Sequence, residues 1–144
     1  MPNYKKTNTI TMKNFLTTFI LTLCSLTIFA QDKITDELKT LTDNKQYDKI
    51  ISQYASKCND CSAKSLYYIG LAYYMKEDDN NCLKFMDKSI EKDAKDPKPF
   101  YIIASTLNYM KKYDEAIKNF QTAISLKPDN AEYYSGLGDS YYNL

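Results

Sequence analysis

The chain contains no His, no Trp and no Arg, and only 3 Gly and 4 Pro occur among its 144 residues. The absence of His removes the commonest general base and metal ligand. A formal net charge of +1 provides no excess of basic residues for nucleic acid. Few Gly and Pro together with 44% apolar residues are typical of an ordered helical protein. We therefore expect no metal, no cofactor and no nucleic acid as ligand.

The most informative feature of the chain is a repeat of 34 residues. With Pro97 as position 1, the stretch 97–130 matches the residues before and after it in register. Positions 4, 7, 8 and 11 hold Leu66, Ile69, Gly70 and Tyr73, then Phe100, Ile103, Ala104 and Leu107, then Tyr134, Leu137, Gly138 and Tyr141. Positions 20, 24 and 27 hold Cys82, Met86 and Ser89, then Ala116, Phe120 and Ala123.

These positions follow one another at intervals of three and four, which places each set on one face of a helix. Small residues at positions 8 and 20, such as Ala104 and Ala116, allow two antiparallel helices to approach closely. One pair cannot bury its own apolar face, so neighbouring pairs must stack around a continuous core. The dipeptide Asp96-Pro97 marks the start of one pair, because Asp caps helices and Pro suits the first helical position.

The pattern resembles the tetratricopeptide repeat. Units of that family carry a large residue, a Leu-Gly step and a Tyr on the first helix, and a small residue, an aromatic, a small residue and a Pro on the second. The resemblance covers residues 63–144. It implies an all-α solenoid of antiparallel helix pairs with a right-handed superhelix. It also implies a scaffold that binds a protein or peptide on a concave face, and not an enzyme.

The repeat divides the chain into four parts after its N-terminal segment. Residues 31–62 are predicted to form a divergent first repeat, in which Leu38 and Ile50 replace the usual small residues. Residues 63–96 and 97–130 are two full repeats. Residues 131–144 correspond to the first helix of a further repeat. Two interpretations of this last helix stay open: it is part of a longer array, or it closes the stack as a cap.

Residues 1–30 have the layout of a secretory signal peptide. Three lysines precede the apolar run 15–29, and Ala30 stands at the expected cleavage site before polar residues. The alternatives are an uncleaved membrane anchor formed by residues 15–29 and a lipoprotein anchored through Cys24. Residues 1–11 are a possible upstream extension, because Met12 would itself make a normal start. We expect an exported protein, periplasmic or extracellular, of bacterial origin, which touches the membrane only through this segment if it is uncleaved.

Cys58 and Cys61 form the one motif that could carry a reaction. A redox pair of this spacing usually stands at a helix N-terminus after a strand, and no strand is predicted here. A zinc site needs four ligands, and the chain lacks His. A local disulfide or two inert thiols is the favoured interpretation. Cys82 occupies a small buried position and is expected to be a packing residue.

In tetratricopeptide repeat proteins, positions 2, 5, 9, 12 and 13 of the first helices line the concave face. The resemblance therefore assigns to this face Lys64, Tyr67, Leu71, Tyr74 and Met75, then Lys98, Tyr101, Ser105, Asn108 and Tyr109, then Glu132, Ser135, Asp139, Tyr142 and Asn143. Members that bind chaperone C-terminal carboxylates have Lys at position 5 and Asn at position 9 of their first repeat. Positions 5 and 9 here hold other residues in both full repeats, so a carboxylate clamp is not expected.

Three functional hypotheses follow. The first is an exported scaffold that binds a protein or peptide through the Tyr-rich groove, since Tyr suits interfaces. The alternative for these tyrosines is packing between neighbouring first helices. The second hypothesis is an N-terminal adaptor of a larger enzyme or signalling protein that continues past residue 144. The third is a thiol–disulfide redox protein that uses Cys58 and Cys61.

Overall fold

A computed structural model describes residues 17, 19–20, 30–58 and 60–144. The chain divides into two compact units, Met1–Ile34 and Thr35–Leu144. Nearly all of the predicted signal segment, with Cys24 and most of the run 15–29, lies outside the described residues. Within the described part of the chain, no helix has both the length and the apolar character to cross a membrane.

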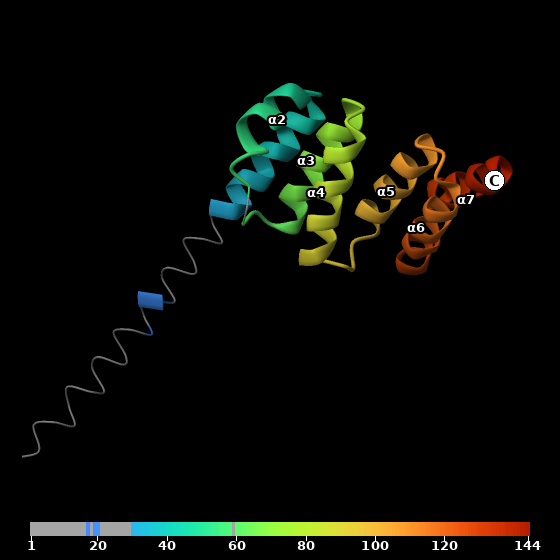
Figure 1. Ribbon diagram of the computed structural model, residues 1–144. Helices are drawn as coiled ribbons and strands as arrows, with labels where there is room; N and C mark the ends of the chain where they lie inside the picture. Colours follow the sequence, from blue (N-terminus) through green and yellow to red (C-terminus); the bar gives the residue numbers. More distant parts are fainter. Residues whose placement is uncertain (1–16, 18, 21–29, 59) are drawn as a thin grey trace, which may run out of the picture. The chain divides into compact units, whose positions relative to one another are not determined.

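The second unit is a series of helices. Residues 30–43 are helical and belong to this unit from Thr35 onward. The six helices that follow are α2 (Tyr47–Tyr54), α3 (Ala63–Met75), α4 (Asp79–Lys92), α5 (Pro97–Tyr109), α6 (Tyr113–Leu126) and α7 (Ala131–Asn143) (Figure 1). Helices α3 and α4 form one pair and α5 and α6 the next, and α4 packs on α5 as α6 packs on α7. This all-α arrangement of stacked pairs confirms the predicted solenoid.

Polar side chains cap the helices where the repeat pattern predicts a boundary. Asp96 accepts a hydrogen bond from the backbone N–H of Lys98 at 3.0 Å, with Pro97 at the first helical position. Asn130 does the same for Glu132 at 3.0 Å. Asp78 caps α4 by accepting a hydrogen bond from the backbone N–H of Asn81 at 3.1 Å. These caps satisfy backbone donors that a helix cannot pair internally.

The turn inside each helix pair has the same backbone conformation. Lys45, Glu77 and Lys111 have φ angles of 55°, 58° and 61°. Each stands just after a first helix, where a left-handed residue commonly ends a helix and reverses the chain. The divergent first pair therefore turns in the same way as the two full repeats.

The small residues of the pattern lie at close helix crossings. Ala104 and Ala116 are both fully buried, at 0% exposure. A Cβ atom on Gly70 would lie 3.0 Å from Cε of Met86 and 3.2 Å from Cβ of Phe85. The side chain nearest to Gly70 on α4 is thus the large Met86, and not Cys82 as the pairing of small positions suggests. Met86 is flexible enough to fill this space.

A second set of first-helix positions, which the pattern leaves out, faces the preceding repeat. Position 10 holds Ala72, Thr106 and Ser140, and all three are fully buried. The Sγ atom of Cys82 on α4 lies 3.4 Å from Oγ1 of Thr106 on α5. The short side chain of Thr106 therefore allows α5 to pack closely against α4.

Gly136 is the tightest of these contacts between repeats. A Cβ atom on Gly136 would lie 2.5 Å from Cε1 of Phe120 and closer still to Cζ. Phe120 is 1% exposed, so its ring has little room to move. Gly138 stands at position 8, which serves the crossing within a pair, and a Cβ there would meet nothing within 4 Å. Gly136 is the glycine of α7 that accommodates the preceding helix α6.

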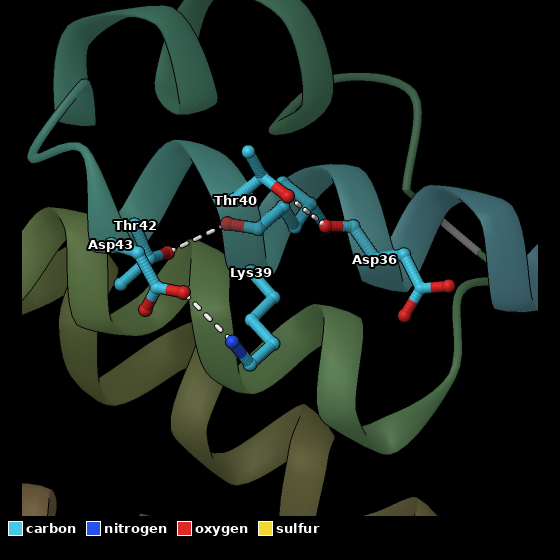
Figure 2. A network of polar contacts seen from close by, with 6 residues as sticks. Asp36, Lys39, Thr40, Thr42 and Asp43 are labelled. Atoms are coloured by element: carbon cyan, nitrogen blue, oxygen red, sulfur yellow. Dashed lines mark hydrogen bonds and ion pairs between the residues drawn. The ribbon is translucent and has the colours of Figure 1, made fainter.

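The first pair of the stack keeps a buried centre although its small residues are lost. Leu38 and Ile50 are both 0% exposed. On the outer side of helix 30–43, Lys39 forms an ion pair of 2.7 Å with Asp43, and Oγ1 of Thr40 donates to the backbone oxygen of Asp36 (Figure 2). These contacts join exposed residues within one helix and add little stability.

Replacing Ala104 by Leu is expected to lower the free energy of unfolding by about 1–3 kcal/mol, because a fully buried crossing has no space for the larger side chain. Lys118→Ala, on the exposed side of α6, is the control and should change it by less than about 0.5 kcal/mol. Urea unfolding monitored by circular dichroism measures both. Equal effects would contradict the assigned packing.

Candidate binding face

The residues assigned to the concave face come from three helices, α3, α5 and α7. Helices α5 and α7 bring six of the assigned residues together around a hollow of about 290 Å³. Its walls are formed by Tyr101, Ser105, Asn108, Glu132, Ser135 and Asp139, with Phe120 and Gly136 below. Residues from positions 5, 9 and 12 of one helix thus meet those from positions 2, 5 and 9 of the next.

Tyr101 forms part of the wall of this hollow and also holds the repeats together. Its ring lies 5.1 Å from the ring of Tyr133 on α7 and 6.0 Å from that of Phe120 on α6, between centroids. On the same face, Oγ of Ser140 donates to Oδ1 of Asn108 at 3.2 Å. The hollow therefore has side chains already fixed by their neighbours, which reduces the entropy lost on binding.

A second hollow, of about 240 Å³, lies at the C-terminal ends of α3 and α5. It is lined by Tyr74, Met75, Glu77, Asp79, Thr106 and Tyr109. Burial raises the pKa of the Tyr74 hydroxyl, and a hydrogen bond with Ser105 opposes this rise. Tyr109 is 70% exposed at the rim. This hollow combines apolar and aromatic surface with two carboxylates.

The α3 end of the face is more closely packed. Burial raises the pKa of the Tyr67 hydroxyl to about 12. The Nζ atom of Lys98 lies 6.0 Å from the centre of the Tyr67 ring, at the limit of a cation–π contact. Leu71 packs against the main hydrophobic cluster, while Lys64 is exposed. Tyr67 and Leu71 therefore contribute more to packing than to an open surface.

The charges on this face are separated along the stack. Glu132 and Asp139 line the first hollow, and Glu77 and Asp79 line the second. The lysines assigned to the face lie at the N-terminal ends of α3 and α5 and are exposed. Tyr142, at position 12 of α7, is 91% exposed and free to contact a partner. Both hollows are therefore acidic and suit hydrogen-bond donors and cations.

Cys58 and Cys61 form a disulfide in the connection between α2 and α3. Both residues are buried, and Asn59 between them lies outside the described residues. In the part of the chain that the structure describes, no cluster of three or more His, Cys, Asp or Glu residues could hold a metal ion. The disulfide closes a short loop just before α3, whose N-terminus is capped by Ser62.

Cys82 is the free thiol of the core, and we expect it to be unreactive. Burial raises the pKa of its thiol to about 11, from a usual value of 9.0. Since the thiolate is the nucleophile, alkylation by iodoacetamide near pH 8 should be about a hundredfold slower in the folded than in the urea-unfolded protein. Mass spectrometry of the Cys82 peptide measures this.

The same shift gives a pH dependence. Because the folded pKa of Cys82 is raised, its contribution to stability is present below pH 9 and is lost as the pH rises through about 11. Rapid alkylation of Cys82 by iodoacetamide in the folded protein at pH 8 would contradict both expectations, because it would show that the thiol is not buried.

Two family models match the chain. Residues 104–144 match the model described as TPR repeat. Residues 43–123, more than half of the chain, match the model described as anaphase-promoting complex, cyclosome, subunit 3. No curated protein matches the sequence significantly.

Solved structures with the same fold include three domains of other proteins. The TPR domain of Arabidopsis OM64 has a TM-score of 0.73 at 18% identity, covering 80% of this chain and 97% of that one. The second TPR domain of human RPAP3, solved with the HSP70 peptide SGPTIEEVD, has a TM-score of 0.68 at 19% identity, covering 75% of this chain and 92% of that one. The first TPR of Spaghetti (RPAP3), bound to the HSP90 peptide SRMEEVD, has a TM-score of 0.71 at 14% identity, covering 78% of this chain and 90% of that one.

The 34-residue period, the stacked antiparallel pairs and the matching models and structures all agree. The chain belongs to the tetratricopeptide repeat family.

Proposed function

We propose that this protein is a binding scaffold that holds a segment of a partner protein on the concave face of α3, α5 and α7. The observation that carries the proposal is the hollow between α5 and α7, where six assigned groove residues converge. Structural relatives solved with bound peptides give further support. Exposed Tyr109 and Tyr142 offer large rigid surfaces with a hydrogen-bonding end.

The charges on the face favour a partner segment with basic or hydrogen-bond-donating side chains. Glu132 and Asp139 border one hollow, and Glu77 and Asp79 border the other. Opposite charges on a partner speed association and select against acidic segments. The proposed partner segment is therefore basic, in contrast to the negatively charged C-terminal carboxylate that a carboxylate clamp binds.

A peptide library displayed on phage and selected on the full chain tests this proposal. Peptides that bind should be enriched in Lys or Arg, and Asp139→Lys should weaken them about tenfold or more by isothermal titration calorimetry. Glu91→Lys is the matched control, because it makes the same charge change on the exposed surface of α4. Equal losses from the two variants, or no selected peptide, would overturn the proposal.

The peptides SGPTIEEVD and SRMEEVD, which the two relatives bind, are expected not to bind this protein below about 1 mM. Their acidic ends would meet acidic hollows, and Tyr67 and Tyr101 stand where the clamp lysine is found in such family members. Fluorescence polarisation with labelled peptides measures the affinity. Micromolar binding would show that the carboxylates on this face do not select the partner.

We further propose that the protein is exported by a bacterium with removal of residues 1–30. The basic and apolar residues of that segment support this, and a disulfide between Cys58 and Cys61 suits an oxidising compartment. Expression in a bacterial host followed by N-terminal sequencing of the periplasmic fraction should give Gln31 as the first residue. Uncleaved protein in the membrane fraction would instead support an anchor formed by residues 15–29.

A further inference from the structure

The two hollows of the concave face are separate recesses that share helix α5. Ser105 and Asn108 of α5 line the hollow toward α7, and Thr106 and Tyr109 of α5 line the hollow toward α3. The hydroxyl of Tyr74, in the wall of the second hollow, forms a hydrogen bond with Ser105, in the wall of the first. Tyr74 and Ser105 therefore form a ridge between the two hollows.

Each hollow has the size and the chemistry to receive one long basic side chain. Their volumes, about 290 and 240 Å³, lie just below the usual range for small-molecule pockets. In the hollow toward α3, Met75 and Tyr109 offer apolar surface to the methylene groups of Lys or Arg, and Glu77 offers a carboxylate to the cation. In the hollow toward α7, Ser135 and Asp139 offer oxygen acceptors.

The distance between the two hollows follows from helix geometry. They lie on opposite sides of α5, so their centres are about one interhelical distance apart, roughly 10 Å. Tyr74 and Met75 stand at positions 12 and 13 of their repeat, whereas Ser135 and Asp139 stand at positions 5 and 9 of theirs. The hollow toward α3 is therefore displaced along the helices by one to two turns, about 5–10 Å. The two displacements together give a separation of roughly 11–14 Å.

We propose that the partner segment crosses the Tyr74–Ser105 ridge in an extended conformation and places one basic side chain in each hollow, with the two basic residues three or four positions apart. This deepens the binding function proposed above and depends on it. An extended chain advances about 3.1–3.4 Å per residue, so three or four residues span the separation. Residues i and i+3 face the same side of a polyproline II helix, as residues i and i+4 do in a β-strand. Adjacent basic residues point in different directions and cannot fill both hollows.

Peptides of identical composition test the spacing against the full chain. The parent is the tightest peptide of the phage selection, with all but two of its basic residues replaced by Gln and those two placed as Lys one, three, four or eight positions apart. Isothermal titration calorimetry should give the highest affinity at three or four, about tenfold above the adjacent pair, because a second contact within reach adds to the first. Attraction to an acidic surface in general would give equal affinities, since the peptide charge never changes.

A double-mutant cycle assigns each Lys of the peptide to a hollow. Glu77→Gln and Asp139→Asn should each weaken the best-spaced peptide about fivefold or more, and Glu91→Gln on the exposed surface of α4 is the matched control. When one Lys of the peptide is replaced by norleucine, one of the two protein variants should cause no further loss, and the other should keep its effect. Replacing the other Lys should exchange the two results.

Two results would overturn the use of both hollows by one segment. They are equal affinities at all four spacings, and a Glu77→Gln protein that binds as tightly as Glu91→Gln. If Asp139→Asn still weakens the peptide in either case, the concave face remains the binding site and only the inference about spacing fails. If no basic peptide binds the chain at all, the binding function itself fails.

Discussion

Replacing Phe120 by Ala is expected to lower the free energy of unfolding by about 3–5 kcal/mol, the largest effect of any single change considered. Phe120 is 1% exposed and joins its own repeat, 97–130, to helix α7 of the next one. Its ring lies 6.0 Å from that of Tyr101 on α5 and directly over Gly136 on α7. Its removal would leave a cavity between three helices that Gly136 has no side chain to fill.

Urea unfolding of the parent protein and of Phe120→Ala measures this loss of stability. Tyr109→Ala is the control, because it removes an aromatic side chain that is 70% exposed and should change stability by less than about 1 kcal/mol. A similar small loss for Phe120→Ala would mean that the contact between α6 and α7 does not form in solution. Loss of the signal from α7 alone would show that this helix depends on Phe120 for its attachment.

Gly136→Ala and Gly138→Ala are expected to have effects of opposite sign. An Ala at 136 must displace the buried Phe120 ring, at a cost of about 1–3 kcal/mol. An Ala at 138 meets no atom and gains about 0.5–1 kcal/mol from its higher helix propensity. Thermal unfolding compares the two variants.

A double variant identifies the cause of the Gly136 effect. In the Phe120→Ala background, Gly136→Ala should no longer be destabilising, because the ring that it displaces is gone. If Gly136→Ala costs the same in both backgrounds, the contact with Phe120 is not its cause. If both glycine variants are stabilising, the close approach of α7 to α6 is wrong.

The sequence predicts the helices of this fold well because its period is strict. The positions given to the two faces of each pair include Ile69, Ala104, Ala116 and Phe120, and all four are buried. The cap at Asp96 also lies where the dipeptide Asp96-Pro97 predicts it. Three matching copies within one chain identify these positions without any knowledge of contacts between repeats.

Contacts between repeats are harder to predict from the pattern. The small residue that the pattern marks, at position 8, serves the crossing within a pair, whereas the crowded Gly136 stands at position 6 and meets Phe120 of the preceding repeat. Position 6 holds Tyr68, Ile102 and Gly136, so its role changes from copy to copy and leaves no common signal. Position 10 did carry a signal, since it holds a short side chain in all three copies.

The proposed binding site rests on positions assigned from the family pattern, and its acidic residues differ from the clamp lysine of carboxylate-binding members. The assigned groove residues of α5 and α7 do converge on one hollow. The tyrosines divide between two roles that the sequence left open: Tyr67 and Tyr101 contact neighbouring side chains, and Tyr109 and Tyr142 are exposed. Whether a tyrosine of this face is buried depends on how α3 and α7 pack, and the residue type alone does not determine that packing.

The most direct test of the binding scaffold is a map of where a selected peptide binds. Two-dimensional NMR of the labelled protein during titration with a phage-selected peptide gives this map. We expect the largest shift changes at Ser105, Asn108, Ser135 and Asp139, which line the hollow between α5 and α7. Changes confined to α2, α4 and α6 would contradict the assignment of the concave face as the binding site.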